Sequence, residues 1–151
     1  MIREAYKQYM ESISSLIPEE RIFTDPLRRL AHGTDGGFYR LEPQIVVRVM
    51  NEAELQHCMS AAFSQKLPVT FKAAGTSLSG QTISDSILLL ANEGWENYEV
   101  LDDGKKVRLQ PGIIGGRVNR ILAPYGRKFG PDPPRLMRQW WAASSLTMPP
   151  G

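Results

Sequence analysis

Cysteine is nearly absent from this sequence, because Cys58 is the only one among 151 residues. A single cysteine excludes an intramolecular disulfide and a cysteine-based metal cluster, and we expect no metal site. Long apolar runs are also absent, since none approaches the roughly 20 residues needed to span a bilayer. The first ten residues, MIREAYKQYM, lack the apolar stretch of a signal peptide. We therefore expect a cytoplasmic protein with no transmembrane segment.

An excess of charge of one sign is missing too. The 18 lysines and arginines outnumber the 16 acidic residues by two. Arg135 and Arg138 lie in a C-terminal stretch without acidic residues, so the rest of the chain has 16 basic and 16 acidic residues and no net charge. Nucleic-acid binding needs a basic face. A basic nucleic-acid binder is therefore poorly supported, and we expect no nucleic-acid partner.

The residues that are present fit one globular domain, with 42% hydrophobic and 23% charged residues. Helices are predicted over residues 4–16, 26–32, 52–66 and 116–123, and strands over residues 45–50, 69–72, 87–91, 98–101 and 107–110. A helical leader (residues 1–40) thus precedes a β-α-β unit and further strands (residues 41–133). This order predicts an α+β (α/β-like) fold with a mixed sheet.

Local signals predict how two of these helices begin and which faces they bury. Asp25 before Pro26, and Asn51 three residues before Glu54, are typical of helix N-termini. Apolar spacing predicts that the inward faces hold Leu27, Leu30 and Ala31 in one helix and Leu55, Cys58, Met59, Ala62 and Phe63 in the other. Arg28 and Arg29 are expected on a solvated face. We expect Cys58 to be packed rather than reactive.

The strongest local feature is the stretch FKAAGTSLSGQ, residues 71–81. A predicted strand runs into small residues, which let backbone N–H groups approach a phosphate, and three hydroxyls add donors. It is not a Walker loop, because Gly-Lys-Ser/Thr is missing. It is not a Rossmann fingerprint either, because no glycine stands two residues before Gly75. The residues alone leave two interpretations open, a tight connection or an anion cradle.

The stretch VTFKAAGTSLSGQ resembles the diphosphate-binding loop of the FAD-linked oxidases, whose FAD-binding domain is typed on vanillyl-alcohol oxidase and p-cresol methylhydroxylase (PCMH). GTDGGFYRLEPQIVVRV, residues 33–49, resembles the family's motif before the first strand, in which Asp, Tyr and Pro occur. LQPGIIGGRVNRILAPYGRKFGPDP, residues 109–133, resembles its next block. The resemblance covers residues 20–133. It is strongest to large bacterial flavoproteins that join a D-lactate- or glycolate-dehydrogenase-like flavin half to an iron–sulfur half.

The resemblance implies cofactor-binding residues but no catalytic residue in this chain. The implied cofactor-binding residues are Lys72, Ala73, Ala74, Gly75, Thr76, Ser77, Leu78, Ser79, Gly80 and Gln81 around the diphosphate, Pro111, Gly112 and Ile113 near the flavin, and Pro131, Asp132 and Pro133 before a second loop. Thr76 stands where some relatives attach FAD through a histidine, so non-covalent FAD is implied. An iron–sulfur cluster would lie only in a C-terminal part outside this chain.

By the same resemblance, the intact enzyme would be an FAD-dependent oxidoreductase that oxidises a small 2-hydroxy acid of the D-lactate or glycolate kind. Its electron acceptor is not implied. This chain would be an N-terminal fragment with half of a cofactor cradle, for which we expect weak or absent FAD binding and no activity. The alternative is a non-enzymatic small α+β domain whose loop binds another anion or a partner. A concave row of inward N–H groups favours the cofactor, and a self-bonded turn favours the alternative.

Residues 134–151, PRLMRQWWAASSLTMPPG, do not match the second FAD loop that follows Pro-Asp-Pro in the family. Read from the third base of each codon, however, Trp140, Trp141 and Ala142 force a Val-Gly pair. With permitted bases elsewhere, that frame encodes Ser-Ile-Asn-Ala-Ala-Met-Val-Gly-Gly-Ile-Val-Ala-Asn-Asn-Ala-Ser-Gly, which is close to the family pattern. Our hypothesis is that residues 134–151 are an out-of-frame reading of this loop. The nucleotide sequence across Pro133 tests it.

Overall fold

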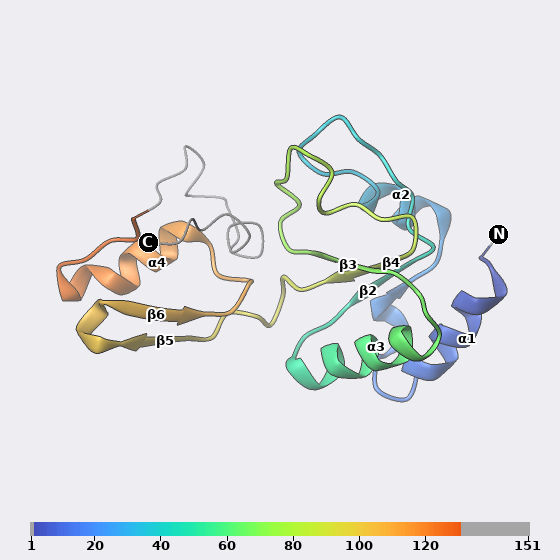
Figure 1. Cartoon of the computed structure of the whole chain (residues 1–151), viewed down its shortest axis with the longest axis horizontal. Helices are drawn as coiled ribbons and strands as arrows, with labels where there is room; N and C mark the ends of the chain where they lie inside the picture. Colours follow the sequence, from blue (N-terminus) through green and yellow to red (C-terminus); the bar gives the residue numbers. More distant parts are fainter. Residues whose placement is uncertain (1, 131–151) are drawn as a thin grey trace.

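The computed structural model describes residues 2–130, which form two lobes (Figure 1). We call residues 2–95 the N-terminal lobe and residues 96–130 the C-terminal lobe. The N-terminal lobe contains α1 (Glu4–Ile13), β1 (Ile22–Phe23), α2 (Pro26–His32), β2 (Ile45–Arg48), α3 (Glu52–Ser64), β3 (Val69–Lys72) and β4 (Ile87–Leu90). The C-terminal lobe contains β5 (Tyr98–Leu101), β6 (Lys106–Leu109) and α4 (Gly115–Leu122). The hypothesis on residues 134–151 concerns positions outside the described residues.

A mixed four-stranded sheet with the order β1-β2-β4-β3 forms the centre of the N-terminal lobe. β4 lies parallel to both β2 and β3, with Ile87 opposite Ile45 on one side and Val69 on the other. β1 runs antiparallel to β2 at one edge and was not predicted from the sequence. The helical leader therefore contributes a strand to the same sheet. This mixed sheet with helices confirms the predicted α+β fold class.

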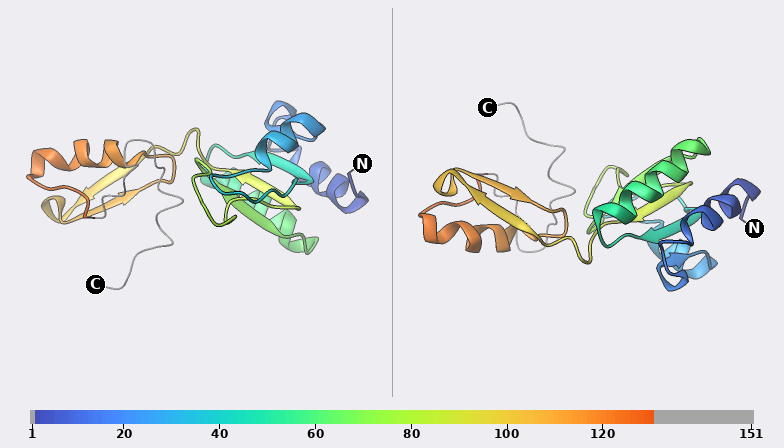
Figure 2. Two further views of the ribbon diagram at one scale, coloured as in Figure 1. Left: turned by 90° about the horizontal axis from the view of Figure 1, so that it is seen from above. Right: turned by 90° about the horizontal axis from the view of Figure 1, so that it is seen from below.

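The two faces of the sheet are covered by different elements (Figures 1 and 2). α1 and α3 cover one face, and α2 with the loops before β2 and β4 lies over the other. Alternate strand residues point to opposite faces. The larger core, under α1 and α3, consists of Tyr6, Tyr9, Ile13, Ile17, Ile45, Val47, Val49, Cys58, Ala62, Ile87, Leu89, Ala91 and Trp95. The smaller core on the other face consists of Phe23, Val46, Leu88 and Leu90.

Both predicted helix starts are confirmed. The Asp25 carboxylate accepts a hydrogen bond from the Arg28 N–H at 2.9 Å, and Pro26 is the first helical residue of α2. The Asn51 side chain accepts one from the Glu54 N–H at 3.0 Å at the start of α3. These bonds satisfy N–H groups that have no partner inside the helix. No helix within residues 2–130 is long and apolar enough to cross a membrane.

The predicted inward faces were partly wrong. Leu27, Leu30 and Ala31 of α2 are exposed, as are Met59 and Phe63 of α3, whereas Cys58 and Ala62 are buried as predicted. Arg29, predicted to be solvated, is buried. Its guanidinium donates to the Pro43 carbonyl at 2.6 Å and pairs with Glu42 at 2.8 Å. α2 therefore packs against the segment before β2 through the side chain of Arg29. The apolar residues of α2 do not form a buried face.

The C-terminal lobe is a smaller unit. β5 and β6 form the predicted hairpin, in which Asp102, Asp103 and Gly104 all have positive φ. α4 packs on this hairpin through a core of three buried residues, Ile113, Val118 and Leu122. No residue of either strand is fully buried.

Candidate functional site

The candidate site lies at the carboxyl ends of the parallel strands. β2, β3 and β4 run in the same direction, so these ends share one edge of the sheet, and this edge faces the C-terminal lobe (Figure 1). The loop of small residues leaves β3 there, and residues 73–86 return over the sheet to β4 without a helix. Ligands of open α/β sheets bind outside the carboxyl ends of the strands. The topology thus places the loop where a ligand is expected.

The loop from Ala73 to Gly80, which we call the phosphate loop, has a backbone largely without internal partners. Its N–H groups from Ala73 to Leu78 and at Gly80 make no hydrogen bond to another residue of the described range. The Ser79 and Gln81 N–H groups donate to the Ser77 hydroxyl at 3.2 and 3.1 Å. Gly75 and Gly80 have φ values of 65° and 74°, a conformation that only glycine adopts without strain. The geometry is that of an open chain of amides rather than a self-bonded turn.

The Lys72 side chain lies against Gly75 of this loop, where an added Cβ would be 3.3 Å from its Nζ atom. Its ammonium donates to the His32 carbonyl at 3.0 Å and to the Thr34 carbonyl at 2.5 Å, and so holds the end of α2 and the segment after it. Burial lowers the pKa of Lys72, and the nearby Asp35 carboxylate opposes this shift. Burial also lowers the pKa of His32, with further contributions from the charges of Lys72 and Arg48. In this geometry Lys72 links the loop at Gly75 to the end of α2, and its predicted role in cofactor binding stays a prediction.

Three buried polar atoms around the loop have no partner among the described residues: the hydroxyls of Thr76 and Thr82 and the Oδ2 atom of Asp35. A buried polar group without a partner costs on the order of 1–3 kcal/mol. The two hydroxyls and the unbonded amides are donors, and the oxygens of a diphosphate are acceptors. The donor set of the loop therefore fits a diphosphate group.

The segment Pro111 to Ile113 does not join this loop directly. The Gly112 N–H donates to the Trp95 carbonyl at 2.8 Å, and a Cβ atom at Gly112 would lie 2.5 Å from the carbonyl oxygens of Asn92 and Trp95. Glycine is thus required there by space. The Ile113 side chain is fully buried in the core of the C-terminal lobe. The implied residues Pro131, Asp132 and Pro133 lie outside the described residues.

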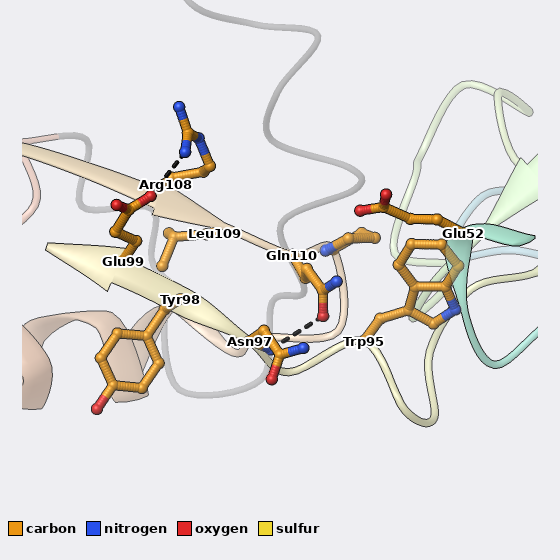
Figure 3. A pocket seen from close by; sticks show the side chains of 9 residues that line it. Glu52, Trp95, Asn97, Tyr98, Glu99, Arg108, Leu109 and Gln110 are labelled. Carbon is orange, nitrogen blue, oxygen red and sulfur yellow. Dashed lines mark hydrogen bonds and ion pairs between the residues drawn. The ribbon is translucent and has the colours of Figure 1, made fainter.

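A separate hollow of about 400 Å³ lies between the lobes and is drawn in Figure 3. It is lined by Glu52, Trp95, Asn97, Tyr98, Glu99, Arg108, Leu109, Gln110 and Pro111. Its polar groups are mostly paired, because Arg108 binds Glu99 at 2.6 Å and the Asn97 N–H donates to the Gln110 side chain at 3.0 Å. Except for Pro111, none of the implied cofactor-binding residues within residues 2–130 lines it. We therefore place the candidate site at the phosphate loop.

Residues 35–37, Asp-Gly-Gly, belong to a stretch that resembles a family motif but were not named as cofactor-binding, yet they lie against the phosphate loop. A Cβ atom at Gly36 would lie within 3.2 Å of the carbonyl oxygens of Thr76 and Ser77. At Gly37 it would lie 2.6 Å from that of Leu78. Two adjacent glycines in a predicted loop were the signal available in the sequence. Nothing in the spacing indicated which segment they contact.

Comparison with known proteins gives a family and a set of distant relatives. A family described as FAD binding domain matches residues 43–140. D-2-hydroxyglutarate dehydrogenase of Pseudomonas putida is 25% identical over 131 residues, which cover 84% of this chain and 13% of that protein. Glycolate oxidase subunit GlcD of Escherichia coli is 27% identical over 97 residues, which cover 63% of this chain and 19% of that subunit. The chain thus spans less than a fifth of the length of these two relatives.

Solved structures share the fold at low sequence identity. An alkyldihydroxyacetonephosphate synthase matches with a TM-score of 0.73 and 15% identity, over 91% of this chain and 29% of that chain. A substrate-bound p-cresol methylhydroxylase matches with a TM-score of 0.65 and 11% identity, over 82% of this chain and 25% of that chain. These matches confirm the predicted fold, the N-terminal part of a PCMH-type FAD-binding domain.

Proposed function

We propose that this chain, which belongs to the FAD-binding domain family, supplies the diphosphate-binding wall of an FAD site in an enzyme that oxidises a small 2-hydroxy acid. The observation that carries the proposal is the row of unbonded amides from Ala73 to Leu78 and at Gly80, at the carboxyl edge of the sheet. The substrate class is supported by the relatives named for D-2-hydroxyglutarate and glycolate.

The residues of the loop would act by binding and orienting. Backbone N–H groups between Ala73 and Gly80 would donate to the diphosphate oxygens, and the Thr76 hydroxyl would find there the partner that it lacks. No side chain of the loop is charged, so the amide dipoles would carry the electrostatic attraction. Bound FAD would accept the hydride equivalent removed from the substrate. The orientation of the flavin ring of FAD would then depend on how firmly the loop holds the diphosphate.

The described residues include the proposed diphosphate wall and offer few contacts for the remainder of the cofactor. Ile113 packs into a core, and Gly112 is closed in by the carbonyls of Asn92 and Trp95. We therefore propose that the 151-residue chain binds FAD weakly, with a dissociation constant on the order of 1 mM, or about 4 kcal/mol. We also propose that it has no turnover by itself and that FAD, when bound, is not covalently attached.

Two-dimensional ¹H–¹⁵N NMR of the full chain during titration with FAD tests this proposal. The expected result is saturable shifts of the amide signals of Ala74 to Gly80, while those of α1 and α3 stay in place. Inorganic pyrophosphate is expected to shift the same signals. If the loop signals respond only to pyrophosphate, the loop is an anion site of a non-enzymatic domain instead. A purified chain with stoichiometric yellow flavin would contradict the proposed weak binding.

Gly75 and Gly126 offer a matched pair of variants. Their φ values are 65° and 64°, so a Gly→Ala change imposes the same backbone strain at both. The pair is matched in backbone strain only: at Gly75, in the phosphate loop, an added Cβ would also meet Lys72 Cε at 2.5 Å, whereas Gly126, after α4, has nothing within 4 Å. Gly75→Ala is expected to weaken FAD binding at least fivefold, and Gly126→Ala to leave it unchanged. Equal binding by both variants would contradict a role for the loop.

A further inference from the structure

We propose that residues 33–40, which we call the Gly-Gly loop, form a backing that aims the amides of the phosphate loop, and that Gly37 is a positioning residue for the diphosphate. This inference rests on the proposed function. It identifies the segment that would hold the backbone of the phosphate loop in its binding conformation. The two loops lie together over the sheet face opposite α3 (Figure 1).

The contact runs along most of the phosphate loop. At one end, the Lys72 side chain lies beneath Gly75, where an added Cβ would meet Lys72 Cε at 2.5 Å, and its ammonium binds the Thr34 carbonyl. At the other end, the Tyr39 side chain lies 3.4 Å from the position of a Cβ on Gly80. Gly36 and Gly37 fill the distance between these two contacts. The Gly-Gly loop therefore supports the phosphate loop continuously, from one of its positive-φ glycines to the other.

The middle of the contact involves the carbonyl groups of three consecutive residues. The carbonyl oxygens of Thr76 and Ser77 are the atoms nearest to a Cβ on Gly36, at 3.2 and 3.1 Å. The carbonyl oxygen of Leu78 is nearest to one on Gly37, at 2.6 Å. The C=O and N–H of a trans peptide point in opposite directions. The Ser77 and Leu78 N–H groups, which follow the first two carbonyls, therefore point away from the Gly-Gly loop, whereas the Ser79 N–H donates to the Ser77 hydroxyl.

This arrangement gives an anion the favourable side of the backbone. Three carbonyl oxygens lie against the glycines, and the Ser77 and Leu78 N–H groups, which have no partner among the described residues, face outward. An anion on the carbonyl side would be repelled. If the peptide groups of the phosphate loop could rotate freely, the affinity for a diphosphate would therefore fall. The Asp35 carboxylate accepts the Gly37 N–H at 2.8 Å and so fixes Gly37 in this position.

Space, and not backbone conformation, requires glycine at residue 37. Gly37 is not among the glycines with positive φ, so alanine could adopt its backbone angles. An alanine Cβ would nevertheless lie 2.6 Å from the Leu78 oxygen and 3.0 Å from the Leu78 carbonyl carbon, which are backbone atoms. The phosphate loop would have to move or turn to relieve this overlap.

The test compares Gly37→Ala with Gly94→Ala in the full chain. Gly94 lies in the segment between β4 and β5, and its added Cβ would meet the Met50 carbonyl oxygen at 2.7 Å with a φ of 79°. Gly94→Ala is therefore at least as disruptive locally, but it does not touch the phosphate loop. For each variant, the thermal unfolding midpoint and the FAD dissociation constant from NMR shifts are measured, with the wild type as reference.

The expected result is that Gly37→Ala weakens FAD binding tenfold or more and shifts the amide signals of Ser77 to Ser79 before FAD is added. Gly94→Ala is expected to lower the unfolding midpoint at least as much while keeping the wild-type affinity. Wild-type affinity in Gly37→Ala would overturn the positioning role and leave the proposed function standing. Equal losses of affinity in both variants would overturn it too, because the effect would then follow stability. A wild type whose loop signals ignore FAD would overturn the proposed function itself.

Discussion

The two lobes differ in how completely they bury their strands. All four residues of β4 in the N-terminal lobe are buried, and both faces of its sheet are covered. In the C-terminal lobe, the residues of β5 and β6 are exposed or half-buried, and one helix covers a core of three residues. Burial of apolar surface is the main stabilising term in folding. The phosphate loop is thus attached to the lobe with the larger stabilising core.

The largest effect is expected from Leu89→Ala in β4. Leu89 is fully buried in the core under α1 and α3. Removal of a buried leucine side chain costs its transfer free energy and leaves a cavity, and we expect the free energy of unfolding to fall by about 3 kcal/mol. Urea denaturation followed by circular dichroism measures this loss. A change below about 1 kcal/mol would contradict the ranking of the two lobes.

The helices and strands that could be predicted are those specified by adjacent residues. The Asn51 and Asp25 caps, the apolar run of β4 and the hairpin around Asp103-Gly104 depend on neighbours in the chain, and they are confirmed. β1 was missed because a strand of two residues is too short to show alternating apolar and polar positions. Its residues form a strand by pairing with β2. The burial of Arg29 was missed because its partners, the Pro43 carbonyl and Glu42, lie in another segment of the chain. The spacing of residues along a helix does not predict such contacts.

In the candidate site too, features specified by adjacent residues could be predicted, and features that depend on distant residues could not. The phosphate loop could be predicted from its small residues and from the family resemblance, and its role in binding a diphosphate stays a prediction. The contact of Gly36 and Gly37 with it joins segments about forty residues apart, and the direction of the Lys72 ammonium depends on where the end of α2 lies. Such features are set by tertiary packing, so a single sequence indicates that glycine or lysine is present without showing what it faces.

A smaller, pH-dependent effect is expected from Glu54→Gln in the N-terminal lobe. Arg21 binds both oxygens of Glu54, at 2.7 and 3.0 Å, and the Met50 N–H donates at 2.8 Å. Burial alone would raise the pKa of Glu54, but these hydrogen bonds outweigh it and hold the pKa below its ordinary value. The carboxylate therefore contributes stability above the ordinary glutamate pKa, and this contribution is lost as the pH falls through the lowered value.

We expect Glu54→Gln to cost about 2 kcal/mol at pH 7, a typical value for hydrogen bonds to a charged group. The cost should shrink toward zero at a pH below the lowered pKa. Urea midpoints measured from pH 7 down to pH 3 follow this change. Glu93→Gln is the matched control, because its pair with Arg48 at 3.2 Å is more exposed and should be worth less than about 0.5 kcal/mol. A cost that does not depend on pH would exclude the carboxylate charge as the cause.

The smallest effect on the N-terminal lobe is expected from Val118→Ala in α4. Val118 is fully buried, but its core contains only Ile113 and Leu122 besides itself, with Val107, Leu109 and Phe129 packed around them. The change should therefore loosen α4 and the hairpin and leave the four-stranded sheet as stable as before, within about 0.5 kcal/mol. Amide hydrogen exchange resolved by segment distinguishes the two lobes. We expect faster exchange in β5, β6 and α4, with β2, β3 and β4 unchanged. If exchange in β4 rises together with that in β6, the two lobes unfold as one unit, and the support of the phosphate loop extends to the C-terminal lobe.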